Sequence, residues 1–238
     1  GATAGLWIST FHAFGARMLR RHADLLGRDR GFVIYDADDA KRLGRTVLRE
    51  LDLDPEQFPV DKMLRRVEQR KHRLRAPGDG GSGVEARFYR RYQRKLEQAN
   101  AFDFADLIFQ TWRLLDGVAG VADRYRARFE HVLVDEFQDT DRAQYALLRL
   151  LCPPDANLVV VGDDDQSIYM WRDADVSNIL GFCKHYPAAR TVKLERNYRS
   201  TQVILDAASA VIATNTDRHH KTLWTERAGG RPVDTWRL

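Results

Sequence analysis

Two adjacent carboxylates, Asp135 and Glu136, directly follow the short apolar run Val132-Leu133-Val134. If that run is a buried strand, both acids reach one edge of a sheet, where parallel α/β sheets bind their ligands. Hydrolysis of ATP needs a carboxylate that holds Mg²⁺, usually through water, and a group that orients the attacking water. Asp135 suits the first role and Glu136 the second. The alternative is that both acids merely begin a loop or favour the N-terminus of the next helix.

A second apolar run is followed by the segment Gly162-Asp-Asp-Asp-Gln-Ser-Ile-Tyr-Met-Trp-Arg172, in which a flexible glycine leads into an acidic turn. Gln166 in this turn can sense a γ-phosphate by hydrogen bonding. In an extended segment Tyr169 and Trp171 share one face. Each can stack on a base for roughly 1–3 kcal/mol, while Arg172 can meet a phosphate. The alternative is that the two aromatic side chains belong to the core.

A third apolar run ends in Leu194-Glu-Arg-Asn-Tyr-Arg-Ser200. Ser200 can cap the helix that follows, which leaves Arg199 in the loop just before it. An arginine that reaches the phosphoryl group in transfer raises the rate by about 10³–10⁵, and Tyr198 can stack on an adenine ring. Taken alone, a Tyr-Arg pair at a helix start is more often a surface ion pair.

These polar segments need a sheet to bring them together. The three apolar runs are typical of strands buried on both faces of a parallel sheet, and they lie at 132–134, 158–161 and 192–194. Helical segments at 141–151, 175–184 and 201–213 separate and follow them. The alternation of strands and helices favours an α/β layer with a parallel sheet.

The first hundred residues favour helices and carry a local excess of positive charge. We expect no clear strand between about 20 and 100, a flexible Gly-rich loop at 76–83, and helices at 9–26, 38–51, 60–74 and 84–99. Residues 62–75 contain seven basic side chains against one acid, Glu68. Acids gather instead at 135–141 and at 163–165, so one region can face phosphates while another holds a cation.

The composition is that of a globular protein with enough apolar residues for one large core or two smaller ones: 238 residues, 44% hydrophobic, 30% charged, net charge +4. Cys152 and Cys183 are too far apart for a CxxC pair, so a reducing cytoplasm fits better than a disulfide framework or zinc site. No apolar run approaches the roughly 18 residues that span a membrane. The first residues lack the features of a signal peptide, and without an initial Met we expect residues upstream.

Five stretches, in this order, resemble the UvrD/Rep/PcrA group of superfamily-one DNA helicases. STFHAFGARML (9–19) resembles the family's STFHxxxxxxL element near the DNA track, and NAFDFADL (100–107) resembles its DFxDL element. DEFQDT (135–140), GDDDQSIYMWR (162–172) and LERNYRS (194–200) are similar to helicase motifs two, three and four. The resemblance covers the chain from residue 9 to about 200.

The resemblance implies ATP and Mg²⁺ as cofactors and assigns a role to each residue around them. Asp135 would bind Mg²⁺, and Glu136 would be the catalytic acid/base. Gln166 would contact the γ-phosphate and couple it to DNA. Arg199 would act as an arginine finger, with Tyr198 near the adenine.

The resemblance also implies single-stranded and duplex DNA as partners, with DNA-repair or replication proteins beside them. Tyr169, Trp171 and Arg172 would touch single-stranded DNA, and Thr10 and His12 would lie along its backbone. Two lobes would close around ATP so that the aromatic side chains step along the bases. By family analogy the movement runs 3′ to 5′.

The implied fold is α/β, a partial RecA-like parallel sheet of the P-loop NTPase type with an inserted helical subdomain. Residues 1–20 and 101–194 would belong to the first RecA-like lobe. Residues 21–100 would form the helical accessory insertion, which can meet duplex DNA. Residues 195–238 would start the second RecA-like lobe.

Two departures from the family pattern bear on activity. Asp173 stands where the family usually has Gly, and its negative charge opposes the neighbouring DNA contact. No glycine is followed by Lys, so the chain has no GxxxxGK[ST] loop to cradle phosphates. In the family that loop lies upstream of the STFH element, and the later motifs of the second lobe lie beyond Leu238. We therefore expect the protein to be an ATP-dependent DNA helicase by family. We expect this chain by itself to hydrolyse ATP feebly or not at all.

Three alternatives stay open. The chain can be the motor part of a RecB/AddA-like helicase-nuclease, which shares the motifs. It can be a non-catalytic DNA-binding module, although such a module has no physical need of Glu136 or Arg199. A metal nuclease built on Asp135 and Glu136 would need a further carboxylate or Lys at a suitable spacing, and DNA cleavage with Mg²⁺ but without ATP would favour it.

Overall fold

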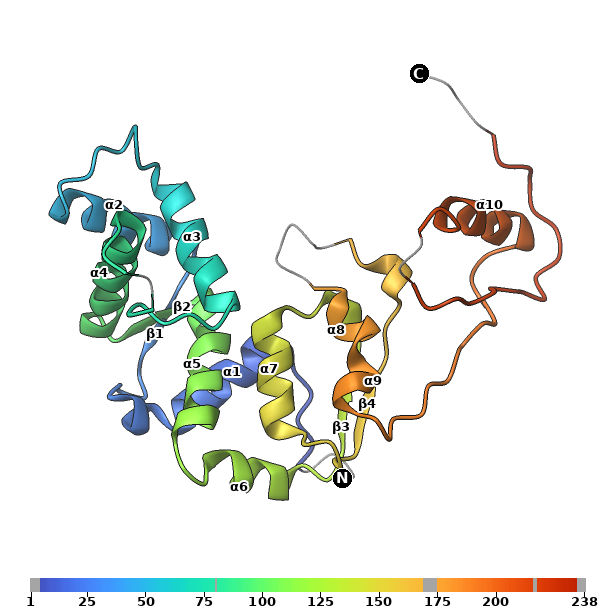
Figure 1. Cartoon of the computed structure of the whole chain (residues 1–238), viewed down its shortest axis with the longest axis horizontal. Coiled ribbons are helices and arrows are strands. Elements are labelled where there is room, and N and C mark those ends of the chain that lie inside the picture. Colours follow the sequence, from blue (N-terminus) through green and yellow to red (C-terminus); the bar gives the residue numbers. More distant parts are fainter. Residues whose placement is uncertain (1–4, 80, 169–174, 216–217, 235–238) are drawn as a thin grey trace.

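The chain folds into helices and two small pairs of strands, and a computed structural model describes residues 5–79, 81–168, 175–215 and 218–234 (Figure 1). The helices are α1 (Phe11–Arg21), α2 (Ala37–Glu50), α3 (Val60–His72), α4 (Val84–Gln98), α5 (Phe104–Gly117), α6 (Val121–Arg128), α7 (Arg142–Leu151), α8 (Ser177–Leu180), α9 (Phe182–His185) and α10 (Gln202–Ile212). The strands are β1 (Val33–Tyr35), β2 (Ala101–Asp103), β3 (Val132–Val134) and β4 (Leu158–Val160).

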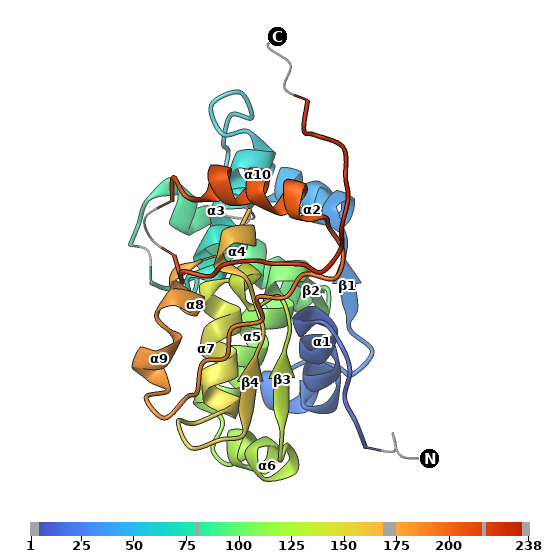
Figure 2. The same cartoon turned by 90° about the vertical axis from the view of Figure 1, so that its right-hand side faces the viewer.

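The elements form three groups in space. Figure 1 shows α2, α3 and α4 at one end beside β1 and β2, and it shows α1, α5, α6 and α7 in the middle. The strands β3 and β4 follow on the far side of α7, together with α8 and α9. The view in Figure 2 shows β3 and β4 side by side along the same direction. In Figure 1, α10 stands apart from this body, joined to it by extended connections.

Most of the predicted helices are confirmed within two residues at each end. α7 shows why its start was visible in the sequence. The Asp141 side chain accepts a hydrogen bond from the Gln144 backbone N at 2.8 Å, and the Gln144 side chain reaches back to the Asp141 backbone, which is a capping box. Two predictions were wrong in extent. The helix predicted at 9–26 ends at Arg21, where a 3₁₀ turn begins, and the one predicted at 175–184 is split at Gly181.

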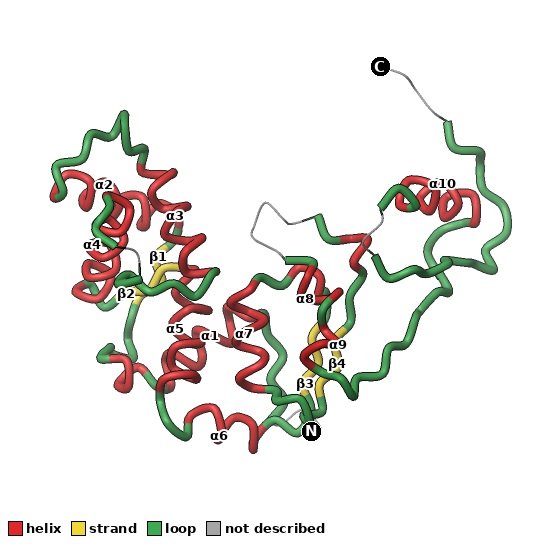
Figure 3. The backbone as a smooth tube through the Cα atoms, in the orientation of Figure 1, coloured by secondary structure: helices red, strands yellow, loops and turns green. Residues whose placement is uncertain are grey.

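The strands form two parallel pairs, drawn in yellow in Figure 3. β3 pairs with β4 in register, with Val132 opposite Leu158 and Val134 opposite Val160, as the two apolar runs predicted. β1 pairs with β2, so the expectation of no strand between 20 and 100 was wrong. A three-residue strand whose partner lies more than sixty residues away carries too little local pattern to be read from the sequence.

The strand predicted at 192–194 is absent from the described part of the chain. These residues belong to no strand, and Val192 and Leu194 are 65% and 79% exposed. The only pairing nearby is an isolated bridge between Arg196 and Trp224 within the described residues. An apolar run predicts a buried strand only where a neighbouring strand and a covering helix exist, and the described residues supply neither here.

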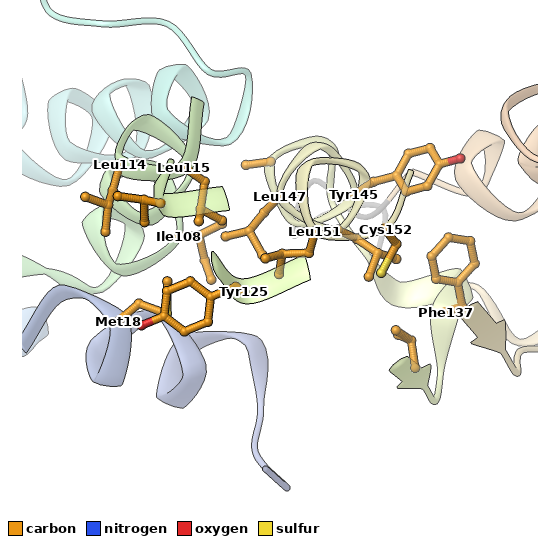
Figure 4. Close-up of a cluster of buried hydrophobic side chains, with 14 of the residues drawn as sticks. Met18, Ile108, Leu114, Leu115, Tyr125, Phe137, Tyr145, Leu147, Leu151 and Cys152 are labelled. Carbon is orange, nitrogen blue, oxygen red and sulfur yellow. The ribbon is translucent and has the colours of Figure 1, made fainter. Parts of the chain in front are cut away.

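The largest core lies between the middle helices and the β3–β4 pair. Figure 4 shows apolar side chains from α1, α5 and α7 meeting there, with Phe137, which follows β3, at the far side. α1 and α5 approach so closely that a Cβ on Gly15 would lie 2.3 Å from the Leu107 carbonyl oxygen. Thr111 Oγ1 donates to that same oxygen at 2.6 Å. The helix that carries the STFH element is therefore fixed against the helix of the DFxDL element.

A second core belongs to α2, α3, α4 and β2, and a buried ammonium joins it to α5. Lys71 has no exposed surface, and its Nζ lies 2.7 Å from an Asp103 oxygen and 3.0 Å from an Asp106 oxygen. Gln93 and Gln110 donate their amides to Asp106 as well. Burial alone would lower the pKa of Lys71, but the two carboxylates outweigh it and the net shift is upward, so the ammonium stays charged. Lys71 is therefore a structural cation and is not available to DNA.

We predict that Lys71→Met destabilises the chain by about 3–5 kcal/mol, because the buried Asp106 and the mostly buried Asp103 lose their cation. Urea denaturation followed by circular dichroism measures this change. Arg66→Ala is the matched control, since Arg66 pairs with Glu85 at 3.5 Å and both side chains are about half exposed. That loss should cost no more than about 1 kcal/mol. Equal stability of the two variants would contradict a structural role for the buried ammonium.

Candidate active site

The register of β3 and β4 brings the two acidic segments to one sheet edge. Val161, which follows β4, donates its backbone N–H to Val134 O at 2.8 Å and accepts from Phe137 N at 2.9 Å. The ladder therefore pairs Val161 with the residues on both sides of Asp135 and Glu136. These two residues are pushed out of the ladder as a short protrusion, and both side chains are exposed.

The protrusion forces an unusual backbone on Glu136. Its φ is +50°, in the left-handed region that non-glycine residues rarely adopt and that costs on the order of 1–3 kcal/mol. Phe137, the next residue, is fully buried and contacts the rings of Tyr145 and Phe182. Burial of Phe137 thus holds the chain in a turn that leaves the Glu136 carboxylate facing solvent.

Asp135 keeps one carboxylate oxygen without a bond to a described residue. Its Oδ1 accepts from the Glu136 backbone N at 2.9 Å. Mg²⁺ prefers oxygen ligands, retains several waters and is usually held by one or two carboxylates together with substrate phosphates. Among the described residues no group of three or more His, Cys, Asp or Glu side chains gathers closely enough to hold a metal by itself. Asp135 therefore fits a metal site that water and phosphate complete.

Gln138 connects the two segments. Its side chain is 1% exposed. Its Nε2 donates to Glu136 Oε2 at 2.8 Å, and its Oε1 accepts from the Asp163 backbone N at 3.0 Å. Sequence reasoning did not select this residue as a site residue, although a polar side chain next to buried Phe137 was the available signal.

The acidic turn of residues 163–165 is paired with cations from late in the chain. Lys221 Nζ lies 2.5 Å from an Asp163 oxygen and 2.6 Å from an Asp165 oxygen, and Arg218 Nη2 lies 2.7 Å from Asp165. Gln166 Nε2 donates to the other Asp163 oxygen at 2.7 Å. Burial would raise the pKa of Asp163, but the bonds from Lys221 and Gln166 outweigh it and the net shift is downward. We call this cluster the acidic-turn clamp.

The chain that follows Lys221 also contacts the third predicted segment. The Thr222 backbone N donates to the Glu195 side chain at 2.8 Å, and the Trp224 backbone N donates to Glu195 O at 3.0 Å. Residues 195–197 therefore lie beside 222–224, next to the clamp. Thr201, not Ser200, is the residue at the N-terminal boundary of α10.

The structure does not bring Arg199 to the carboxylates. Within the described residues no hydrogen bond or ion pair joins the Arg199 side chain to Asp135, Glu136 or Gln166. Its backbone N donates to the Asn197 side chain at 2.9 Å, and its guanidinium is exposed. Tyr198 is 73% exposed as well. The roles of Arg199 and Tyr198 at a nucleotide stay predictions.

The residues expected along DNA are described in part. Thr10 is the N-cap of α1, and its hydroxyl oxygen accepts from Ala13 N at 3.2 Å. His12 stacks on Phe104 with ring centroids 4.0 Å apart. Burial, with a smaller contribution from His72, lowers the pKa of His12 to about 4, so at neutral pH it offers hydrogen bonds rather than a charge. Residues 169–172, with Tyr169, Trp171 and Arg172, lie outside the described residues.

Comparison with known proteins decides the family. The sequence model of the family described as UvrD/REP helicase N-terminal domain matches residues 2–187. The chain belongs to the UvrD/REP helicase family. It is 43% identical over 235 residues to "ATP-dependent DNA helicase PcrA" of Staphylococcus aureus, and equally to the protein of that name from Staphylococcus epidermidis. The matched part is 96% of this chain and 32% of each relative, so the chain spans about a third of the length of the curated relatives it matches.

Family membership confirms the predicted fold class, a partial RecA-like domain with short parallel sheets. No helix in the described ranges is both long and apolar enough to cross a bilayer. The RecA-like strands that carry motifs two and three in the UvrD/REP pattern are β3 and β4, and both motifs begin at their carboxyl ends.

We predict that the double variant Arg218→Ala, Lys221→Ala breaks the ion pairs that join residues 218–221 to the acidic turn. Amide hydrogen exchange in residues 163–167 and 218–224 should become about tenfold faster or more, since hydrogen bonds to charged groups contribute about 1.5–3 kcal/mol each. Lys184→Ala, on the exposed side of α9, is the control. The same exchange rates in both variants would show that the clamp does not hold these segments.

The pH range over which the acidic-turn clamp protects these residues from exchange follows from the pKa shifts of Asp163 and Lys221. The pKa of Asp163 lies below its ordinary 3.8, so its contribution is present above that pH and is lost as the pH falls further. The pKa of Lys221 lies above its ordinary 10.5, so its contribution is present below that pH and is lost at higher pH. Protection in the unmodified chain should therefore stay constant between about pH 4 and 10 once the intrinsic exchange rate is divided out.

Proposed function

We propose that this chain supplies the metal-binding and water-activating half of the ATP site of a 3′ to 5′ DNA helicase. The observation that carries the proposal is the pairing of Val161 on both sides of Asp135 and Glu136, which sets two carboxylates beside the turn of Gln166. The similar proteins are named ATP-dependent DNA helicases, which supports ATP as the substrate and DNA as the track.

Each residue at the sheet edge has a role in this proposal. The second oxygen of Asp135 would hold Mg²⁺, which when bound neutralises charge on the phosphates. Glu136 would orient the attacking water and take its proton. Gln166 would meet the γ-phosphate, and its side chain would then exchange its bond to Asp163 for one to phosphate. Arg199 would approach from residues 195–238 as that segment closes on the strand ends, with Tyr198 near the adenine.

The DNA track would run past the N-terminus of α1. Thr10 and His12 would hydrogen-bond to the backbone of single-stranded DNA, with Tyr169, Trp171 and Arg172 against its bases and phosphates. Residues 1–20 and 101–194 would belong to the first lobe, 195–238 to the second, and 21–100 to an insertion that meets duplex DNA. The separate core of α2, α3 and α4 supports an insertion with its own interior.

We propose further that the protein works in the cytoplasm with DNA-repair or replication proteins as partners. Cys152 and Cys183 are free thiols, the first buried and the second exposed. An exposed free thiol persists best in a reducing compartment.

The first test is Glu136→Gln in the full-length protein that contains this chain. The substitution keeps the size of the side chain but removes its ability to take a proton, so kcat for ATP should fall by about 10²–10⁴-fold. Affinity for ATP and for single-stranded DNA should stay largely unchanged. Glu130→Gln, at the exposed start of the same strand segment, is the matched control and should keep full activity. Loss of DNA binding in Glu136→Gln would point to a structural role instead.

The second test uses the chain by itself. Since no GxxxxGK[ST] loop is present to cradle the phosphates, the 238-residue chain should hydrolyse ATP feebly or not at all, even with single-stranded DNA. A sensitive assay of phosphate release measures this. Turnover of several ATP per second would place all essential groups within the chain. It would refute the proposal that this chain holds only half of the ATP site.

A further inference from the structure

We propose that Gln138 is the residue that positions Glu136 and ties it to the acidic turn of Gln166. The inference deepens the proposed function and rests on it for its kinetic part. Glu136 projects from a protrusion into solvent, where a glutamate has several accessible rotamers. Among the described residues, the one hydrogen bond to its carboxylate comes from Gln138 Nε2, at 2.8 Å. Gln138 thus selects one direction for the carboxylate.

The orientation of the Gln138 amide is fixed by its surroundings. Its Oε1 faces the Asp163 backbone N–H at 3.0 Å, which can only donate. The amide therefore cannot be reversed, and Nε2 must face Glu136. Ser167 Oγ donates to the backbone carbonyl oxygen of Gln138 at 3.4 Å, which holds the main chain there as well. Gln138 is 1% exposed, so water cannot readily replace Glu136 and Asp163 as partners of its side chain.

Gly162 leaves the space that this contact needs. A Cβ at this position would lie 2.7 Å from Gln138 Oε1 and 3.0 Å from Ile179 Cδ1. The glycine is thus required by the close approach of a neighbouring side chain and not by a left-handed backbone, which corrects the interpretation of Gly162 as a flexible link. The segment after β4 is shaped to receive Gln138.

The contact joins the two halves of the proposed chemistry. The Asp163 backbone N–H donates to Gln138 Oε1, and Asp163 Oδ2 accepts from the Gln166 side-chain amide. The Glu136 carboxylate and the Gln166 amide are therefore joined by three successive hydrogen bonds that run through Gln138 and Asp163. A shift of the turn when Gln166 meets phosphate would move the Glu136 carboxylate with it. Gln138 acts through Glu136 and does not itself touch the reacting atoms.

The kinetic test compares Gln138→Met and Gln138→Glu in the full-length protein. Met keeps the volume and removes both bonds, while Glu keeps the acceptor and removes the donor to Glu136. Both should lower kcat about 10–100-fold, the loss expected when a catalytic group is displaced by about 1 Å or loses its supporting shell. KM for ATP and the Kd for single-stranded DNA should change less than about threefold. An unchanged kcat, or a loss confined to KM, would overturn the proposal.

Gln110→Met is the matched control. Gln110 is also buried, its amide donates to Asp106 at 3.3 Å, and its oxygen accepts from Arg113 at 3.3 Å, but it lies on α5 away from the sheet edge. If kcat falls equally in Gln110→Met and Gln138→Met, the loss comes from reduced stability and the positioning role is refuted.

A second measurement needs no ATP and uses the chain itself. Gln138→Met should speed amide exchange in residues 162–167 by about tenfold, because the Asp163 N–H loses its acceptor, while Gln110→Met should not. If the full-length protein proves not to hydrolyse ATP but this exchange effect is present, the proposed function fails. The contact of Gln138 with the acidic turn is then still supported. If exchange in residues 162–167 is unchanged, the contact between Gln138 and the acidic turn is refuted.

Gly162→Ala provides an independent geometric check. In the full-length protein its Cβ should displace the Gln138 side chain and lower kcat about 10-fold or more. Combined with Gln138→Ala, which removes the nearest of the atoms that the Cβ meets, it should add less to the loss than it does alone. Fully multiplicative losses would contradict a shared contact.

Discussion

The position of the candidate site depends on two backbone hydrogen bonds of one residue, Val161. Because its N–H pairs with Val134 and its C=O with Phe137, the chain between those partners has to leave the ladder and return within two residues. Glu136 makes that return in the left-handed conformation, with φ at +50°. Burial of Phe137 offsets the cost. The exposure of Asp135 and Glu136 is thus a consequence of strand pairing and not of a flexible loop.

The helical group is connected to this edge by α3. At the end of α3, Lys71 neutralises Asp103 and Asp106 at the start of α5. The next residue, His72, places Nδ1 3.2 Å from a carboxylate oxygen of Asp141, the N-cap of α7 that directly follows the DEFQDT segment. Two adjacent side chains therefore fix the helical group against both helices that flank the site. These contacts link the helical group, with the basic run of residues 62–75, to the sheet edge of Asp135 and Glu136.

The sequence was sufficient for what short-range patterns determine. It predicted β3, β4 and most helices, since apolar runs and capping residues act within a few positions. It did not predict β1, whose partner is distant, or the burial of Lys71, which looks like the other cations of its run. Val192 and Leu194 show the opposite error, because an apolar run becomes a strand only where another strand is available to pair. Gln138 escaped selection because its bond to Asp163 joins segments more than twenty residues apart.

Charge pairing separates the two acidic segments, which look alike in the sequence as candidates to hold a cation. In the turn of residues 163–165 the carboxylates already face Lys221 and Arg218, and a metal ion there would have to displace these cations. Asp135 instead meets a single backbone N–H, and Glu136 meets a neutral amide. A divalent cation is attracted where negative charge is uncompensated, so the physical preference is for Asp135. The turn of residues 163–165 then serves to anchor Gln166 and the Gln138 contact, and its charge holds the late segment 218–224 against the sheet edge.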